Sequence, residues 1–320
     1  MNESDFVQQQ NTICEFSSSD SWVILSPIEQ SIKRKIEAVG TPLKDWDIQI
    51  NYGIKTGFND AFIISTEKRE EILANCKDVD ERKRTDELIR PILRGRDIKR
   101  YGYDWAGLWL IYIPWHFPYQ FDESIQGSSE KAEKAFREQY PAVYSHMLQY
   151  KEPLSKRNKA ETGIRYEWYA MQRWGAKYWE DFNKPKVVYM EIQTDNPEEG
   201  YPFPCYSYDD NRCVVLNTAY IMCSETIDPR YVLGILNSML GKFLVKLYVT
   251  QLQERQFRML SQYVMRFPIA HPTGEQEREM THLVLDALVN KSIASENRID
   301  ELAFQIYRLS ETEIKYLRNR

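Results

Sequence analysis

Residues 52–64 have the sequence YGIKTGFNDAFII, in which two β-type runs flank a polar segment with two glycines. This pattern predicts a strand, a tight turn and a second strand. Glycine allows the backbone of such a turn to approach a partner closely. The side chains that the turn offers to a partner are Lys55, Thr56 and Asn59. The alternative is a plain hairpin in which Asn59 bonds to its own backbone.

Residues 92–101 have the sequence ILRGRDIKRY. They end an apolar stretch that we expect to be helical, and they form a dense basic cluster around a glycine. The cluster consists of Arg94, Arg96, Lys99 and Arg100. An arginine fork can grip a phosphate or pair with guanine in the major groove of DNA. The same side chains can instead form salt bridges with Asp97 and neighbouring acids.

Residues 165–174, with the sequence RYEWYAMQRW, combine basic, amide and large aromatic side chains in one loop-like stretch. Its candidate DNA contacts are Arg165, Tyr166, Gln172 and Arg173. A glutamine can recognise adenine and an arginine can recognise guanine, so Gln172 and either Arg165 or Arg173 suit base contacts. The alternative is that the aromatic side chains anchor the core. These are Trp168, Tyr169 and Trp174.

The net charge of −5 argues mildly against a nucleic-acid partner, because DNA-binding domains are usually basic. The charge is nevertheless segregated along the chain. Residues 82–100 hold eight basic and three acidic side chains, and residues 151–186 hold nine and five. Residues 191–210 hold six acidic side chains and no basic one. The chain can therefore carry a basic face, or each run can be an ordinary solvated surface.

Composition limits the class of protein. No apolar run approaches the roughly 20 residues that a membrane-spanning helix needs, and we expect a soluble, cytoplasmic protein. The five cysteines are an odd number without paired CxxC motifs, which favours reduced thiols over a disulfide framework or a zinc site.

The pattern of elements predicts an α+β fold with short strands, helical insertions and a helical C-terminal tail. We expect a flexible leader over 1–20, a connecting helix within 21–45, a mixed domain over 46–265 and helices over 266–320. Ser26 and Glu29 form a capping-box signature for the first helix, and Ser310 and Glu313 form another for the last. Between them the expected strands are 48–52, 61–65, 108–114, 186–193 and 212–223, and the expected helices are 67–93, 129–150 and one that Asp228 opens.

These stretches, in this order, resemble the C-terminal specificity domain of TaqI-like and type IIG restriction-modification enzymes. The resemblance spans roughly residues 22–320. It includes the Leu-Arg-Gly-x-Asp-Ile motif at 93–98, the aromatic segment at 165–174, the strand at 184–192 and the helical end at 299–314. It implies a DNA target-recognition domain with no chemistry of its own. The tail helices are the candidate docking surface for a catalytic module.

The resemblance implies that an adenine-specific methyltransferase accompanies the domain in enzymes of this kind, and that a nuclease can accompany it too. The methyltransferase needs a Phe-x-Gly-x-Gly loop and a catalytic motif with adjacent prolines, and this sequence contains neither. We therefore expect no catalytic residue, no metal site and no cofactor in this chain. S-adenosylmethionine, and Mg²⁺ for a nuclease, belong to the catalytic modules. The domain is either a piece of a larger enzyme or a stand-alone specificity protein.

Two other functions remain open. A domain of this kind could bind a protein partner and no longer bind DNA. Alternatively, Asp97 and Lys99 together with Asp86 or Glu87 imitate the carboxylate and lysine spacing of metal-dependent nucleases. Glu313-Ile314-Lys315 has the same spacing, which shows how easily a highly charged chain produces it.

Overall fold

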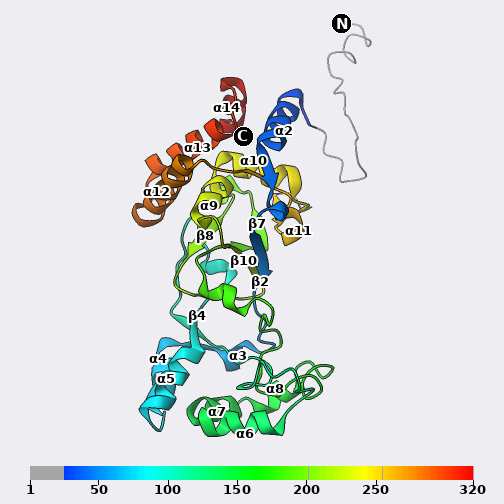
Figure 1. Ribbon diagram of the computed structural model, residues 1–320, viewed down its shortest axis with the longest axis vertical. Helices are drawn as coiled ribbons and strands as arrows, with labels where there is room; N and C mark the ends of the chain where they lie inside the picture. The colour runs from blue at the N-terminus through cyan, green and yellow to red at the C-terminus, as the bar shows by residue number, and fades with distance from the viewer. Residues whose placement is uncertain (1–24, 201, 254, 320) are drawn as a thin grey trace. The chain divides into compact units, whose positions relative to one another are not determined.

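The computed structural model describes residues 25–200, 202–253 and 255–319, which form two compact units (Figure 1). The strand unit comprises Gln49–Ile192 and Cys205–Ser224. The helical unit comprises the described residues of the remaining segments, so it draws on both ends of the chain. The predicted leader over 1–20 lies outside the described residues. Among the described residues, no helix combines the length and apolarity that crossing a bilayer requires.

The strand unit contains two four-stranded sheets. The first has the order β2-β10-β6-β8, with bounds Ile48–Tyr52, Ala219–Ser224, Lys186–Met190 and Tyr206–Asp209. The second has the order β3-β5-β4-β9, with bounds Ile63–Ser65, Leu108–Ile111, Ile89–Leu93 and Val214–Val215. Strands β4 and β9 run parallel, whereas β6 pairs antiparallel with both β8 and β10. The expectation of a mixed α+β fold is confirmed.

The strand unit also contains short helices. They are α3 (Asn59–Phe62), α4 (Thr66–Ala74), α5 (Val79–Leu88), α6 (Glu130–Gln139), α7 (Pro141–Leu148), α8 (Lys151–Lys156), and the 3-10 turns η2 (Gly95–Asp97) and η3 (Trp179–Asn183). Helices α6 and α7 confirm the helical prediction for 129–150. The predicted apolar side of α6 is buried, because Ala132 and Phe136 are inaccessible and Ala135 is nearly so.

The predicted hairpin over 52–64 is wrong. Strands β2 and β3 belong to different sheets, and residues 61 and 62 are helical. The segment between them pairs elsewhere: Gly53 donates to the carbonyl of Ala219, and Ile54 donates to that of Val215, both at 2.9 Å. A Cβ at Gly53 would lie 2.0 Å from the Leu216 carbonyl oxygen. The glycine does allow a close approach, but the partner is the chain's own backbone.

The helix predicted over 67–93 ends earlier than expected. It is split into α4 and α5, and its last five residues form β4 between β5 and β9. Pro91 explains the change, because proline in a helix interior removes a hydrogen bond and clashes with the preceding turn. The other two long predicted strands are also interrupted. The 186–193 stretch forms β6 and β7 (Ile192–Thr194), and the 212–223 stretch forms β9 and β10.

The helical unit combines helices with two small sheets. Its helices are α2 (Pro27–Val39), α9 (Pro229–Asn237), α10 (Met239–Tyr248), α11 (Ser261–Val264), α12 (Gly274–Asn290), α13 (Ile293–Ile306) and α14 (Glu311–Arg318), with 3-10 turns η1 (Leu43–Asp45) and η4 (Pro197–Glu199). Its strands are β1 (Gly40–Pro42) with β13 (Pro268–Ala270), and β11 (Gln251–Gln253) with β12 (Gln256–Arg258) and β7. Both predicted capping boxes, at the starts of α2 and α14, are present.

The helix predicted to start after Asp228 is two helices. Ser238 has extended backbone dihedrals and caps α10 by accepting from the Gly241 amide, which ends α9. The residues of both helices are mostly buried, as expected for a core element.

A buried ion pair holds the first sheet of the strand unit together. Lys186 on β6 and Asp209 on β8 are both fully buried, and Nζ lies 2.5 Å from Oδ2. Lys186 also donates to the carbonyl of Phe182 at 2.9 Å. Asp209 accepts from the Tyr103 hydroxyl at 2.9 Å and from the Cys213 amide at 3.0 Å. The two charges therefore connect β6 and β8 with each other and with the segments that hold Phe182, Tyr103 and Cys213.

Replacing Lys186 by Met leaves the Asp209 carboxylate buried without its cation. We expect the free energy of unfolding to fall by about 3–5 kcal/mol, which urea titration would measure. The matched control is Lys184→Met, because Lys184 pairs with Asp181 at 2.8 Å in a more exposed setting. That control should cost less than about 1 kcal/mol. Equal losses in the two variants would contradict the role assigned to the buried pair.

Glu313 ties α14 to α2 in the helical unit. Its carboxylate accepts from Lys35 at 2.6 Å and from the hydroxyl of Ser31 at 2.8 Å, both on α2. It also accepts from the Ser310 amide at 2.7 Å. Burial by itself would raise the pKa of Glu313, but these bonds outweigh burial and lower the pKa to about 2.

The stabilisation by Glu313 should be complete above its unfolded pKa of 4.5 and disappear as the pH falls to about 2. We expect Glu313→Gln to lose about 1–2 kcal/mol at pH 7, and the difference from the wild type to shrink across that window. Urea unfolding at several pH values measures it. Glu311→Gln, on the exposed side of α14, is the control and should change little. A difference that is independent of pH would show that the charge of Glu313 does not stabilise the fold.

Candidate nucleic-acid interface

Arg157, which follows α8, organises the loop that connects α8 to β6. Its guanidinium donates to the carbonyls of Thr56 at 2.6 Å and Trp168 at 3.0 Å, and also to that of Ala170. Its charged carbon lies 5.5 Å from the ring centroid of Tyr166. Burial lowers the pKa of Arg157 to about 10. A single partly buried cation therefore joins the segment around residue 56 to the segment around residue 170.

This arrangement brings two of the three predicted DNA-contact stretches together. Lys55 and Arg173 exchange backbone hydrogen bonds at 2.9 and 2.8 Å, and the backbone N–H of Gln172 donates to the Thr56 carbonyl at 3.3 Å. Gly57 has a φ of +79°, and a Cβ there would lie 3.1 Å from that of Gln172. The contact is too close for most side chains. The exposed side chains of Lys55 and Arg173 thus extend from one backbone joint.

Beside this joint lies a concave space of about 790 Å³, which we call the amide groove. It is lined by Gln49, Asn51, Trp115, Glu161, Gln172, Arg173, Trp174, Gly175, Ala176, Lys177, Tyr178 and Asp181. Asn51 donates to Asp181 at 2.7 Å, and Gln172 donates to Glu161 at 3.4 Å. These carboxylates orient the amides, while Arg173 and Lys177 supply positive charge. Amide and guanidinium groups are those that recognise base edges.

The remaining side chains of these two stretches are mostly structural. The Thr56 side chain is buried and its hydroxyl donates to the Asn59 side-chain oxygen at 2.6 Å. Tyr166 is fully buried and stacks on Trp115 with ring centroids 4.7 Å apart. Neither side chain is accessible in this structure. Arg165 is exposed, 4.0 Å from Glu161. The alternative that the large aromatics anchor the core is confirmed for Trp168, Tyr169 and Trp174, which are all buried.

The basic cluster at 94–100 is a separate feature of the strand unit. Arg94 forms a two-pronged salt bridge with Asp97, at 3.0 and 2.8 Å, as the alternative interpretation predicted. Burial opposes ionisation of Asp97, yet the bonds from Arg94 prevail and lower its pKa. Lys99 donates to the Arg96 carbonyl at 2.9 Å, and Arg100 lies over the Tyr101 ring. The Arg96 side chain is exposed, and its contact with DNA remains a prediction.

The Arg94 salt bridge also bears on the nuclease alternative. Both Asp97 oxygens are occupied by Arg94, and Lys99 is directed to a carbonyl. Among the described residues, no group of three or more His, Cys, Asp or Glu side chains is arranged to hold a metal ion. Nothing in the strand unit favours Asp97 as a metal ligand.

The structure adds one surface that the sequence reasoning missed. Strands β11 and β12 form a ribbon at the edge of a three-stranded sheet whose third strand is β7, with Gln251 opposite Phe257. Its side chains include the exposed Gln251, Gln253 and Arg258, which are of the types that contact DNA bases and phosphates. The sequence signal for this surface was the run of glutamine and arginine in residues 251–258, which matches no known short motif.

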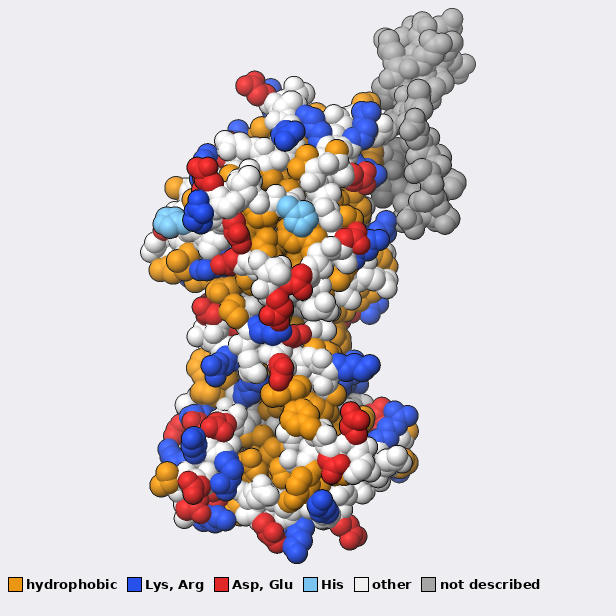
Figure 2. Space-filling model, viewed as in Figure 1, with side chains coloured by type: hydrophobic (Ala, Val, Ile, Leu, Met, Phe, Trp, Pro, Cys, Tyr) orange, Lys and Arg blue, Asp and Glu red, His pale blue; other side chains and the backbone are white. Residues whose placement is uncertain are grey.

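Neither sign of charge dominates the face of the molecule shown in Figure 2. Figure 2 shows Lys and Arg side chains interspersed with Asp and Glu on the face in view. Segregation along the sequence therefore does not become a uniform basic face there. Recognition would depend on the placement of individual cations rather than on a broad positive potential.

The chain matches a family model and a curated relative. Residues 90–269, more than half of the chain, match the family model of the TaqI-like C-terminal specificity domain. The chain is 21% identical over 314 residues to the type II methyltransferase M.BstVI of Geobacillus stearothermophilus, covering 95% of this chain and 47% of that protein. The chain thus spans about half the length of this curated relative.

Two solved structures match this chain, and the first of them shares its fold. One is the type IIL restriction-modification enzyme MmeI in complex with DNA, with a TM-score of 0.53 and 14% identity, covering 87% of this chain and 36% of that one. The other is the type IIG restriction endonuclease BpuSI, with a TM-score of 0.47 and 11% identity, covering 88% and 33%.

Removing the Arg157 cation tests whether it holds the two stretches together. Arg157→Met leaves several buried carbonyls without a donor, so we expect a loss of about 3 kcal/mol in unfolding free energy. We also expect faster hydrogen exchange at the amides of Lys55 and Arg173, measured by mass spectrometry. The control is Lys156→Met, whose exposed side chain pairs with Glu152 on the surface. Unchanged exchange at both amides would show that the joint forms without Arg157.

Proposed function

Because the chain belongs to the family of TaqI-like C-terminal specificity domains, we propose that it recognises a specific DNA sequence for a restriction-modification system. The observation that carries this proposal is the amide groove, where oriented amides lie beside two cations. The similarity to a type II methyltransferase, and the fold shared with a restriction-modification enzyme solved in complex with DNA, support the same role.

Each group in the amide groove has a distinct part in this proposal. Gln172 and Asn51 each present a donor and an acceptor, the combination that pairs with adenine in the major groove. Arg173 pairs with guanine or holds a phosphate, and Lys177 neutralises a phosphate. Lys55, next to Arg173 at the backbone joint, adds a second phosphate contact. Arg96 in the basic cluster and the β11–β12 ribbon supply further contacts to DNA.

The chemistry on DNA is assigned to other modules. We propose that an adenine-specific methyltransferase, with or without a nuclease, is positioned by this domain, as part of the same protein or as a separate subunit. S-adenosylmethionine, and Mg²⁺ for cleavage, would be held there. The tail helices suit docking, because Leu285, Val289 and Ile293 in α12 and α13 are large apolar side chains that are 43%, 65% and 74% exposed. Exposed apolar side chains close together are typical of interaction surfaces.

The test is selection from a random duplex pool at two salt concentrations, with sequencing of the bound fraction. Wild-type protein should enrich one short motif and bind less at high salt, because phosphate contacts release counterions. Gln172→Ala should relax the preference at one base pair by about 1–3 kcal/mol. Arg96→Ala should instead weaken binding on all sequences and reduce the salt dependence.

Matched controls are Gln149→Ala and Lys134→Ala, which change exposed residues outside the amide groove and the basic cluster. Both should bind as the wild type does. Enrichment that is unaltered by Gln172→Ala would remove the amide groove from recognition. If the wild type binds no duplex at low salt but binds a methyltransferase, the domain serves protein interaction instead.

A further inference from the structure

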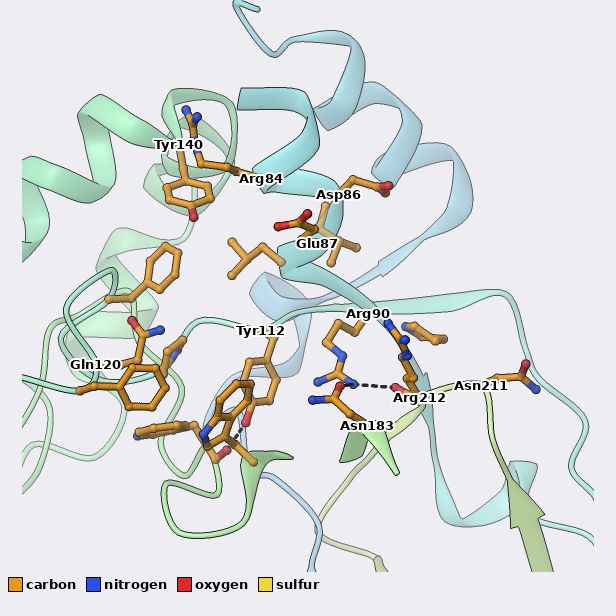
Figure 3. A pocket seen from close by; sticks show the side chains of 18 residues that line it. Arg84, Asp86, Glu87, Arg90, Tyr112, Gln120, Tyr140, Asn183, Asn211 and Arg212 are labelled. Atoms are coloured by element: carbon orange, nitrogen blue, oxygen red, sulfur yellow. Dashed lines mark hydrogen bonds between the residues drawn. The ribbon is translucent and has the colours of Figure 1, made fainter. Parts of the chain in front are cut away.

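A second cavity in the strand unit, of about 530 Å³, has a different chemistry from the amide groove. We call it the aromatic pocket. It lies between the end of α5, strand β4, the loop after β5 and the turn η3 (Figure 3). Its volume falls in the range of small-molecule sites, which is about 300–1,000 Å³. Trp174 lines both cavities, so the segment that follows Gln172 forms a wall between them.

The aromatic pocket offers a stacking surface. Phe121 is 61% exposed although it is a large apolar side chain. Its ring centroid lies 5.6 Å from that of Trp179 and 6.4 Å from that of Trp174. Exposed, mutually supported rings are the platforms on which bases stack in proteins that bind single nucleotides or single strands.

Positive charge lines another part of the pocket. Arg90 is fixed, because it donates to the Asn183 side chain at 2.7 Å and to the Arg212 carbonyl at 2.9 Å. Arg84 lies over the Tyr140 ring at 5.7 Å. The side chain of Arg212 also lines the pocket. Figure 3 shows Arg84 beside Tyr140 and, on another side of the pocket, Arg90 beside Arg212. The pair of Arg90 and Arg212 suits an anion such as a phosphate.

The two carboxylates of the pocket have different roles. Asp86 is paired with Arg69 and is directed away from the cavity. Glu87 extends into the space between Arg84 and Tyr140 on one side and Tyr112 and Gln120 on the other (Figure 3). A carboxylate there accepts N–H donors from a ligand and leaves the lining with a net positive charge.

Two buried polar atoms of the lining are unsatisfied. Nε of Arg84 and Oε1 of Gln120 are buried and have no hydrogen-bond partner. Nearly all buried polar atoms in proteins are paired, so these two mark the lining as a place where the fold leaves hydrogen-bonding capacity unused.

We propose that the aromatic pocket binds one nucleotide, with its base stacked against Phe121 and Trp179 and its phosphate held by the pair of arginines. Glu87 accepts N–H groups of the base, which favours guanine because its edge carries adjacent N–H donors. The nucleotide is either free or part of an unpaired strand, since both have the same chemistry. The proposal does not depend on the amide groove recognising duplex DNA.

Calorimetric titration of the full chain tests this with three ligands: guanosine monophosphate, a single-stranded guanine trinucleotide and inorganic phosphate. We expect saturable binding of the nucleotide, the trinucleotide or both, and weaker binding of phosphate. Phe121→Ala should weaken nucleotide binding about tenfold, from the loss of one stacked ring. Glu87→Gln should weaken it as well. Tighter binding of guanosine monophosphate would identify a free nucleotide as the ligand, and tighter binding of the trinucleotide would identify an unpaired strand.

The matched controls are Ile164→Ala and Glu123→Gln, which alter exposed residues outside the pocket and should bind as the wild type does. The motif enriched from duplex DNA should be unchanged in Phe121→Ala, which separates this site from the proposed recognition function. The proposal is overturned if neither nucleotide ligand binds up to millimolar concentration, if Phe121→Ala binds like the wild type, or if phosphate alone binds as tightly as the nucleotide.

Discussion

The strand unit depends on one pair of charges placed where water does not reach. Lys186 and Asp209 lie on adjacent strands, and each has further partners that fix neighbouring segments. An isolated charge in such a position would be very costly, so the pair and its hydrogen bonds must form together. Through the Phe182 carbonyl, the lysine fixes the end of η3, which is part of the wall of the aromatic pocket. The position of the candidate binding surfaces thus follows from a contact in the sheet.

Arg157 has a comparable role in the loops. Its guanidinium donates to carbonyl oxygens of two segments. Three carbonyls around one guanidinium determine where Gln172 and Arg173 lie, although Arg157 does not line the amide groove. A basic residue in a charged run can therefore be structural, and its type alone does not distinguish it from a contact residue.

The sequence predicted those features that are encoded over a few residues. The capping boxes at Ser26 and Ser310 were correct, because a cap needs only its own first turn. The hairpin at 52–64 was wrong, because the choice of pairing partner depends on residues more than 150 positions away, at Val215 and Ala219. The helix extended to residue 93 was wrong, because Pro91 and the neighbouring strands outweighed the preceding helical pattern. Features encoded by neighbouring residues can be predicted from the sequence, whereas the choice between distant pairing partners cannot.

The candidate site shows the same division. The partly buried Gln172 and the exposed Arg173 were identified by residue type, and the structure places them together in the amide groove. Thr56 and Tyr166 were identified in the same way but are buried. Arg157, Gln49 and Asn51 were missed, since their relevance comes only from tertiary contacts. Burial is the property that separates these groups, and it is not determined by the neighbouring letters of the sequence.

The joint between Lys55 and Arg173 is made by main-chain atoms. Its geometry therefore does not depend on the identity of the two side chains that it displays. Substitutions at these positions can change what the surface binds while the loops keep their arrangement. A site built in this way is well suited to evolutionary divergence, and it is equally a convenient place for a protein engineer to install new preferences.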